Sequence, residues 1–394
     1  MKKLLIFTIG GLMLSAACCA QKKQIGEART ILKSGKNIEQ AEKLMTDLLK
    51  NKDNENNTRI YDIWLQAVEK QYLALNEKMY VKQKVDTTNF FGITKRMFVV
   101  AERLDSIDAM PDKNGKVNPE YRKDNAAKMS AYRPNIYYGG AYHLKKGDFK
   151  TAFDFFEMYL DCDRQPLFTG YDLMYKDPKM GEVAYWATYC GYRLNDPVLV
   201  LRHAATAQRD EQKLEYTLQY MAEAWDKLED DSMYIATLWQ GFKKYPKSNY
   251  FFPRLMDTYN RRGDYTMADS VVNEALKTDT LNELYLFAKS MVMLNLKKYG
   301  DCLKFSDQLI ELNPNLPDIY YNGGLACLNI AQRMDSRKYK KQVKKMYEKA
   351  RPYMEKYREM APDEVDKWAP ALYRIYFNLN MGKQFDEIDK LMKK

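Results

Sequence analysis

The feature that most constrains the fold of this chain is an internal repetition with a period of about 34 residues. Segment 249–280 has apolar or small residues at three- and four-residue steps on both sides of Gly263-Asp264. This is the pattern of two amphipathic helices joined by a turn. Pro246 and Pro314 lie one period before and one period after Thr280, the last residue of that segment. The chain is therefore expected to repeat helical hairpins.

The register can be followed along most of the sequence. Units start at Arg133, Gly181, Glu215, Asn249, Glu283, Pro317 and Val365. Two insertions of equal length, near 165–180 and 330–345, interrupt the spacing. The eighth, twentieth and twenty-seventh places of the units hold mostly small residues, with Tyr234 and Met256 among the exceptions. Small side chains at these places would let helix backbones approach closely, as stacked hairpins require.

Composition and the N-terminal third agree with a helical chain. Only 18 Gly and 13 Pro occur in 394 residues, and helix-forming residues are abundant. Residues 25–50 fit one hairpin, residues 58–81 and 88–109 fit long helices, and residues 110–120 form a loop rich in turn formers. Asp86, Thr87 and Thr88 are the candidate caps of the second long helix. The expected fold class is all-α, an α-solenoid of antiparallel helix-turn-helix repeats.

The first twenty residues have the features of a secretory signal. Lys2 and Lys3 precede an apolar run from Leu4 to Leu14, and small residues follow. Cys18 and Cys19 leave two processing routes open, namely ordinary cleavage near Ala20 or lipidation of one cysteine. We therefore expect a signal at 1–20, divergent helical hairpins at 21–130 and the repeat region at 131–394. The mature protein is expected in the periplasm or at the outer membrane, with a lipid anchor as the open alternative.

The residues needed for catalysis or metal binding are scarce. The chain has two histidines, and His143 falls at a repeat place that holds Trp225, Tyr259 or Met293 in other units, so a packing role is expected. His203 has no acid or cysteine three or four positions away on its predicted helix. Common zinc, serine-nucleophile and phosphate-loop motifs are absent from the sequence. We expect no catalytic residues, no metal site and no cofactor.

The net charge limits the classes of partner, and the cysteine content limits the number of disulfide bonds. The formal charge of +10 becomes +8 once Lys2 and Lys3 leave with the signal. Nucleic acid is not expected as a partner in an exported protein, whereas an acidic protein or an anionic membrane surface is compatible with this charge. The four cysteines that follow the signal are expected to be small buried residues, although one disulfide bond remains open: Cys162, Cys190, Cys302 and Cys327.

Segment 249–280 resembles the tetratricopeptide repeat (TPR) family, in which helix pairs recur with this period, small residues hold fixed places and a proline often ends the unit. The resemblance implies a solenoid that binds a protein or peptide in a concave groove. It also implies that the second, fifth, ninth, twelfth and thirteenth places of each unit face that groove. The candidate partner-binding residues at these places are Tyr137, Lys145, Asp257, Asn260, Arg261, Tyr321 and Asn329.

A basic cluster marks the second insertion. Its cations are Arg333, Arg337, Lys338, Lys340, Lys341, Lys344, Lys345 and Lys349, with Asp335 and Glu348 as the only acids among them. One interpretation is a lengthened, solvated helix. The other is a contact with an acidic partner or with anionic lipid head groups.

These observations predict an exported, non-enzymatic interaction scaffold or adaptor of the bacterial cell envelope. Two alternatives stay open. The abundance of aromatic residues, with 31 Tyr, 16 Phe and 5 Trp, is compatible with a glycan-binding lipoprotein similar to the SusD-like family. A noncatalytic subunit of an envelope enzyme complex has no sequence feature that separates it from a scaffold.

Overall fold

The computed structural model describes residues 21–393, and the described residues form helices, turns and loops with no strand among them. The expected all-α class is therefore confirmed. The expected signal, including Cys18 and Cys19, lies outside the described residues. The chain divides into two compact units, one ending at Asp230 and one beginning at Asp231.

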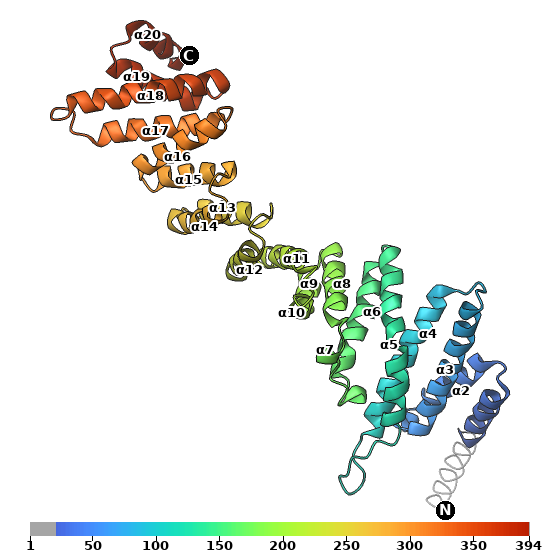
Figure 1. Cartoon of the computed structure of the whole chain (residues 1–394). Coiled ribbons are helices and arrows are strands. Elements are labelled where there is room, and N and C mark those ends of the chain that lie inside the picture. The colour runs from blue at the N-terminus through green and yellow to red at the C-terminus, as the bar shows by residue number, and fades with distance from the viewer. Residues whose placement is uncertain (1–20, 394) are drawn as a thin grey trace, which may run out of the picture. The chain divides into compact units, whose positions relative to one another are not determined.

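The first unit is a series of helical hairpins in which each helix contacts the next (Figure 1). Residues 21–34 are helical, and the hairpin expected at 25–50 and both long helices are present. The following helices are α2 (Ile38–Leu48), α3 (Thr58–Tyr80), α4 (Thr87–Asp108), α5 (Arg122–Lys145), α6 (Phe149–Asp161), α8 (Met180–Arg193), α9 (Pro197–Arg202), α10 (Ala204–Ala207) and α11 (Leu214–Lys227). Short helices lie between them, namely η1 (Lys52–Asn54), η2 (Cys162–Arg164), η3 (Pro166–Phe168) and α7 (Leu173–Lys176).

The second unit continues the same pattern of paired helices. It contains α12 (Asp231–Lys244), α13 (Phe251–Arg261), α14 (Tyr265–Thr278), α15 (Glu283–Asn295), α16 (Tyr299–Leu312), α17 (Pro317–Arg333), α18 (Lys340–Met360), α19 (Val365–Asn378) and α20 (Gly382–Met392). Three first helices begin at the residues that the register predicts, Glu283, Pro317 and Val365. The hairpin predicted from Glu215 has both of its helices, α11 and α12, but they belong to different units.

The Gly-Asp pairs of the sequence form the hairpin turns. The glycine ends the first helix, and the aspartate caps the N-terminus of the second helix. Gly147 and Gly263 end a helix with φ angles of 77° and 67°, which glycine adopts without steric cost. The next residue begins the second helix. Asp148 Oδ1 accepts a hydrogen bond from the amide of Thr151 at 3.2 Å, and Asp264 Oδ1 accepts one from Met267 at 3.0 Å. Of the candidate caps before α4, Asp86 is the residue that caps it.

The small repeat places are where the two helices of a hairpin, or neighbouring hairpins, meet. A Cβ atom on Gly140 would lie 2.4 Å from the Phe156 ring, and one on Gly241 would lie 2.2 Å from the Phe251 ring. Ala152 and Ala268, at the twentieth place, are fully buried. The larger exceptions Tyr234 and Met256 are also buried, with exposed fractions of 8% and 5%. The predicted close approach of helices is confirmed.

Aromatic side chains and cysteines fill the space between the helices. His143 is buried and stacks on Phe155 with ring centroids 5.5 Å apart, as expected for a packing residue. All four described cysteines are buried and free, which agrees with the expected packing role. Burial raises the pKa of the Cys190 thiol to about 12.

Gly191 provides a test of this packing, because a Cβ atom there would lie 2.5 Å from the backbone nitrogen of Val200. Backbone cannot move aside as a side chain does, so Gly191→Ala should lower the free energy of unfolding by about 2 kcal/mol. Gly92 lies within α4 and a Cβ atom there would meet open space, so Gly92→Ala should raise stability by about 0.5–1 kcal/mol. Urea unfolding followed by circular dichroism measures both, and equal effects would contradict the close approach at Gly191.

Candidate functional site

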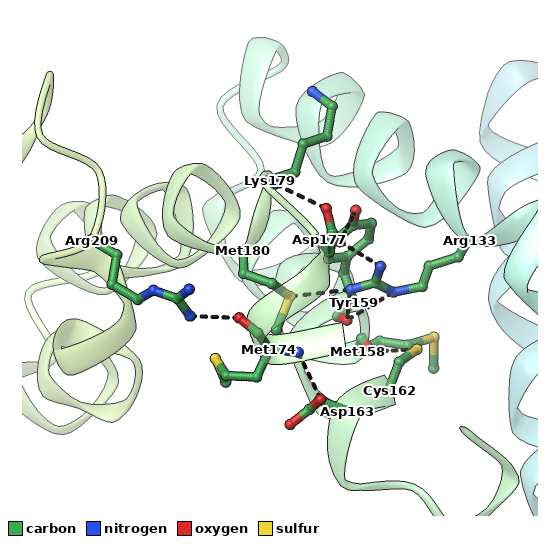
Figure 2. A network of polar contacts seen from close by, with 10 residues as sticks. All are labelled: Arg133, Met158, Tyr159, Cys162, Asp163, Met174, Asp177, Lys179, Met180 and Arg209. Atoms are coloured by element: carbon green, nitrogen blue, oxygen red, sulfur yellow. Dashed lines mark hydrogen bonds and ion pairs between the residues drawn. The ribbon is translucent and has the colours of Figure 1, made fainter. Parts of the chain in front are cut away.

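The insertion between α6 and α8 is held by a buried ion-pair network (Figure 2). Arg133 on α5 donates from Nη1 to Asp177 Oδ2 at 2.5 Å and from Nη2 to the Tyr159 carbonyl at 3.0 Å. Its guanidinium carbon lies 3.6 Å from the centre of the Tyr159 ring, and the Tyr159 hydroxyl donates to Asp177 at 2.7 Å. The buried charge of Arg133 and the half-buried charge of Asp177 are thereby paired and hydrogen-bonded.

The charge of Asp177 is maintained by these contacts. Burial by itself would raise the pKa of its carboxyl, but hydrogen bonds from Tyr159, the Lys179 amide and Arg133 outweigh burial and hold the pKa below its ordinary value. Two further bonds fix the middle of the insertion. Asp163 accepts from the Met174 amide at 2.7 Å, and Arg209 donates to the Met174 carbonyl at 2.6 Å. The insertion is therefore anchored to the hairpins on both of its sides.

A pocket of about 590 Å³ lies beside this insertion. Its lining includes Tyr175, Trp186, Glu182 and Arg209. Several of its charged groups are already engaged, since Asp177 pairs with Arg133, Arg209 donates to the Met174 carbonyl and Glu182 accepts a 2.7 Å hydrogen bond from Tyr137. Tyr137, a candidate groove residue, thus uses its hydroxyl within the protein. The aromatic surface of the pocket is accessible, because Tyr175 is 84% exposed.

A second pocket, of about 420 Å³, lies within the second unit between α12 and α13. Three of the seven candidate groove residues, Asp257, Asn260 and Arg261, line it together with Tyr234 and Arg254. The three share a face because positions i, i+3 and i+4 of a helix are neighbours. The opposite side of α13 is held in the core by Leu255 and Met256, among others. We call this the α12–α13 pocket.

Polar groups in the α12–α13 pocket lack partners. The Oδ1 atom of Asn260 is buried and has no hydrogen-bond donor. Among the residues that the structure describes, no ion pair or hydrogen bond engages the side chains of Asp257 and Arg261. Arg254, by contrast, donates to the Tyr250 carbonyl at 3.2 Å and stacks over the Tyr250 ring. A buried acceptor without a donor costs about 1–3 kcal/mol, so a ligand that supplies a donor would recover that free energy.

The other candidate residues are not part of this pocket. Lys145 is exposed at the end of α5 in the first unit. Tyr321 is half-buried with its ring 5.0 Å from that of Tyr357, and Asn329 donates to the Leu325 carbonyl one turn earlier on α17. The register thus brings three candidates together and leaves four elsewhere.

An acidic pocket of about 250 Å³ between α4 and α6 could not be predicted from the repeat register. Glu102, Glu157 and Asp161 line it, and burial, with repulsion from Asp161, raises the pKa of Glu102 to about 7. His203 is buried nearby, its Nε2 lies 3.8 Å from Glu157 Oε1, and burial lowers its pKa. Residues 21–393 contain no group of three or more histidine, cysteine or acidic residues placed to hold a metal ion.

Removal of the Arg133 side chain should release the insertion. In Arg133→Met the half-buried Asp177 carboxylate loses its cationic partner and the Tyr159 carbonyl loses the guanidinium donors, which should cost about 3–5 kcal/mol. Hydrogen exchange of the amides at 165–180 should accelerate. Arg193→Met is the matched control, since Arg193 is exposed and stacks over Phe149 at the surface. Equal exchange in the two variants would show that Arg133 does not anchor the insertion.

The raised pKa of Glu102 predicts a pH dependence of stability. A carboxyl that holds its proton more tightly when folded loses folding free energy as the pH rises from about 4.5 to 7. Glu102→Gln removes this loss, so its advantage over wild type should grow from near zero at about pH 4.5 to about 2–3 kcal/mol at about pH 8. Urea unfolding at both pH values measures it, with the exposed Glu77→Gln as control. A constant difference across this range would refute the prediction.

No helix in the described part of the chain is long and apolar enough to cross a membrane. No protein-family description matches the sequence, and no curated protein matches it.

Similar solved structures include TPR proteins. The C-terminal part of a TPR repeat-containing protein from Cytophaga hutchinsonii is 16% identical, with a TM-score of 0.41, over 64% of this chain and 92% of that one. The TPR domain of P58(IPK) is 11% identical, with a TM-score of 0.27, over 92% of this chain and 99% of that one. A chain of the Cut9–Hcn1 hetero-tetramer of the APC/C is 12% identical, with a TM-score of 0.32, over 96% of this chain and 89% of that one. The assignment of the fold therefore rests on this chain's own helix pairs, which repeat as the resemblance to TPR proteins implies.

Proposed function

We propose that this protein is an exported, non-enzymatic scaffold of the bacterial cell envelope that binds a peptide or protein segment in the α12–α13 pocket. One observation carries the proposal. Three residues that the repeat register assigns to the binding face, Asp257, Asn260 and Arg261, line one pocket and have polar groups with no partner among the described residues.

The chemistry of these groups suits an extended polypeptide. A peptide backbone presents N–H donors, and Asn260 Oδ1 is a buried acceptor that lacks one. Asp257 and Arg261 carry opposite charges on the same helix face, so they favour a ligand segment with a basic and an acidic side chain. Tyr234 adds apolar area to the wall of the pocket.

The same lining argues for binding over chemistry. Tyr234, Arg254, Asp257, Asn260 and Arg261 include one carboxylate and no histidine, cysteine, serine or threonine within the described lining. A pair of groups that could exchange a proton with a bound substrate is therefore not assembled there.

Glycan binding is the second candidate, and the pocket beside the insertion supports it. Tyr175 and Trp186 contribute aromatic surface to that pocket, and Tyr175 follows Met174, whose backbone is held by Arg209 and Asp163. Aromatic faces of this kind can stack on sugar rings. Glu182 and Arg209 already make hydrogen bonds within the protein, so fewer polar groups of this pocket are left to bind sugar hydroxyls. Peptide binding is therefore favoured over glycan binding.

In-cell crosslinking of a tagged copy, followed by mass spectrometry of envelope fractions, tests the scaffold. Asn260→Ala combined with Arg261→Ala should reduce recovery of the partner at least tenfold, because truncation of central interface residues costs about 2 kcal/mol or more. Arg262→Ala is the control. Arg262 follows Arg261 directly but pairs with Asp231 at the surface and does not line the pocket.

Circular dichroism of the double variant should show the helical content of wild type, so that reduced recovery of the partner is not caused by unfolding. If the double variant recovers the same envelope proteins as wild type, the pocket is not the binding site. Retention of glycans in place of proteins, with loss on Tyr175→Ala, would favour the second candidate.

A further inference from the structure

The second insertion lengthens two neighbouring helices. Helices α17 and α18 have 17 and 21 residues, whereas α15 and α16 of the preceding hairpin have 13 and 14. At 1.5 Å per residue the excess is about 6–10 Å. Within this unit the turn between α17 and α18 extends past the ends of α15 and α16 (Figure 1). We call residues 334–345 the basic tip.

Five cations of the basic tip are uncompensated. Arg337, Lys338, Lys340, Lys341 and Lys345 are not buried, and none has an acidic partner within 4.0 Å among the described residues. Lys344 and Lys349, by contrast, pair with Glu348 and Asp307. The one acid of the tip, Asp335, accepts hydrogen bonds from the amides of Arg337 and Lys338 and so shapes the turn.

The position of these charges does not favour folding. Helix α18 begins at Lys340, and its first turn contains no acid. The N-terminal end of a helix is its positive end, so Lys340 and Lys341 are placed where a cation is unfavourable. The N-cap residue Tyr339 makes no side-chain hydrogen bond to the free amides of that turn. Like charges along the tip add further repulsion, and a bound anionic surface would relieve both effects.

We infer that the basic tip binds the surface of an anionic lipid bilayer. The cations lie on a projecting turn, a shape that can meet a flat surface with several side chains at once. Tyr339 lies among them and is 40% exposed, and aromatic residues beside lysines are typical of bilayer interfaces. A protein interface of ordinary size buries about 800 Å² on each side around an apolar core. The tip has a single exposed aromatic ring, which favours the bilayer.

Vesicle co-sedimentation of the full-length protein as purified from cells tests this inference. Vesicles of phosphatidylcholine with phosphatidylglycerol are compared with vesicles of phosphatidylcholine alone, so that any lipid anchor contributes equally to both. Each tip cation should contribute about a fivefold preference for the anionic vesicles. The preference should fall as salt is added. Replacement of Arg337, Lys338, Lys340, Lys341 and Lys345 by glutamine should abolish it.

The control removes the same charge from exposed lysines elsewhere in the second unit. Its five glutamine substitutions are at Lys247, Lys298, Lys304, Lys383 and Lys390. This control should keep most of the preference. The double variant Lys340→Gln with Lys341→Gln should lose about two fifths of the preference on a logarithmic scale. Equal losses in the two five-site variants would overturn the inference, since net charge alone would then explain binding.

The bilayer inference would also be overturned if the wild-type protein did not bind anionic vesicles but was retained on an immobilised acidic polypeptide. That result would indicate an acidic protein partner. The test is independent of the α12–α13 pocket. The Asn260→Ala and Arg261→Ala variant should bind vesicles as wild type does.

Discussion

Close packing of neighbouring helices at small residues is the contact on which the rest of the structure depends. Gly140 meets the Phe156 ring, Gly241 meets the Phe251 ring, and Gly191 meets the backbone of Val200. A methyl group at any of these places would overlap its neighbour. Because each hairpin buries its surface mainly against adjacent hairpins, stability is a sum of local contacts. Such a fold can accept an insertion between two hairpins, or in the turn of one hairpin, without loss of the contacts on either side.

The two insertions show how differently such additions are accommodated. The first, at 165–180, folds back onto the hairpins through the Arg133 and Asp177 ion pair and through the bonds of Met174 to Asp163 and Arg209. The second extends α17 and α18 outward and leaves five cations uncompensated. The first insertion therefore contributes to the structure of its unit, whereas the second adds charge that the unit does not use.

Much of the repeat region could be predicted from spacing alone. The turns at Gly147 and Gly263, the starts of α15, α17 and α19, and the shared face of Asp257, Asn260 and Arg261 all follow from a regular register and helix geometry. The Arg133 network could not be predicted, because its partners lie in an insertion outside the register. The division of the chain into two compact units at Asp230 could not be predicted either, since the register continues through that residue without a break in spacing.

Two sets of polar groups that folding leaves without partners point to the proposed functions. Asn260 Oδ1 is buried without a donor, and Lys340 and Lys341 lie at the unfavourable end of a helix. Several polar groups elsewhere in the described chain are satisfied internally, since Asp148 and Asp264 cap their helices and Asp177 pairs with the buried Arg133. Local conflicts of this kind persist in proteins mainly where function requires them. The proposed peptide partner would supply a donor to Asn260, and the proposed anionic bilayer would supply negative charge to the basic tip.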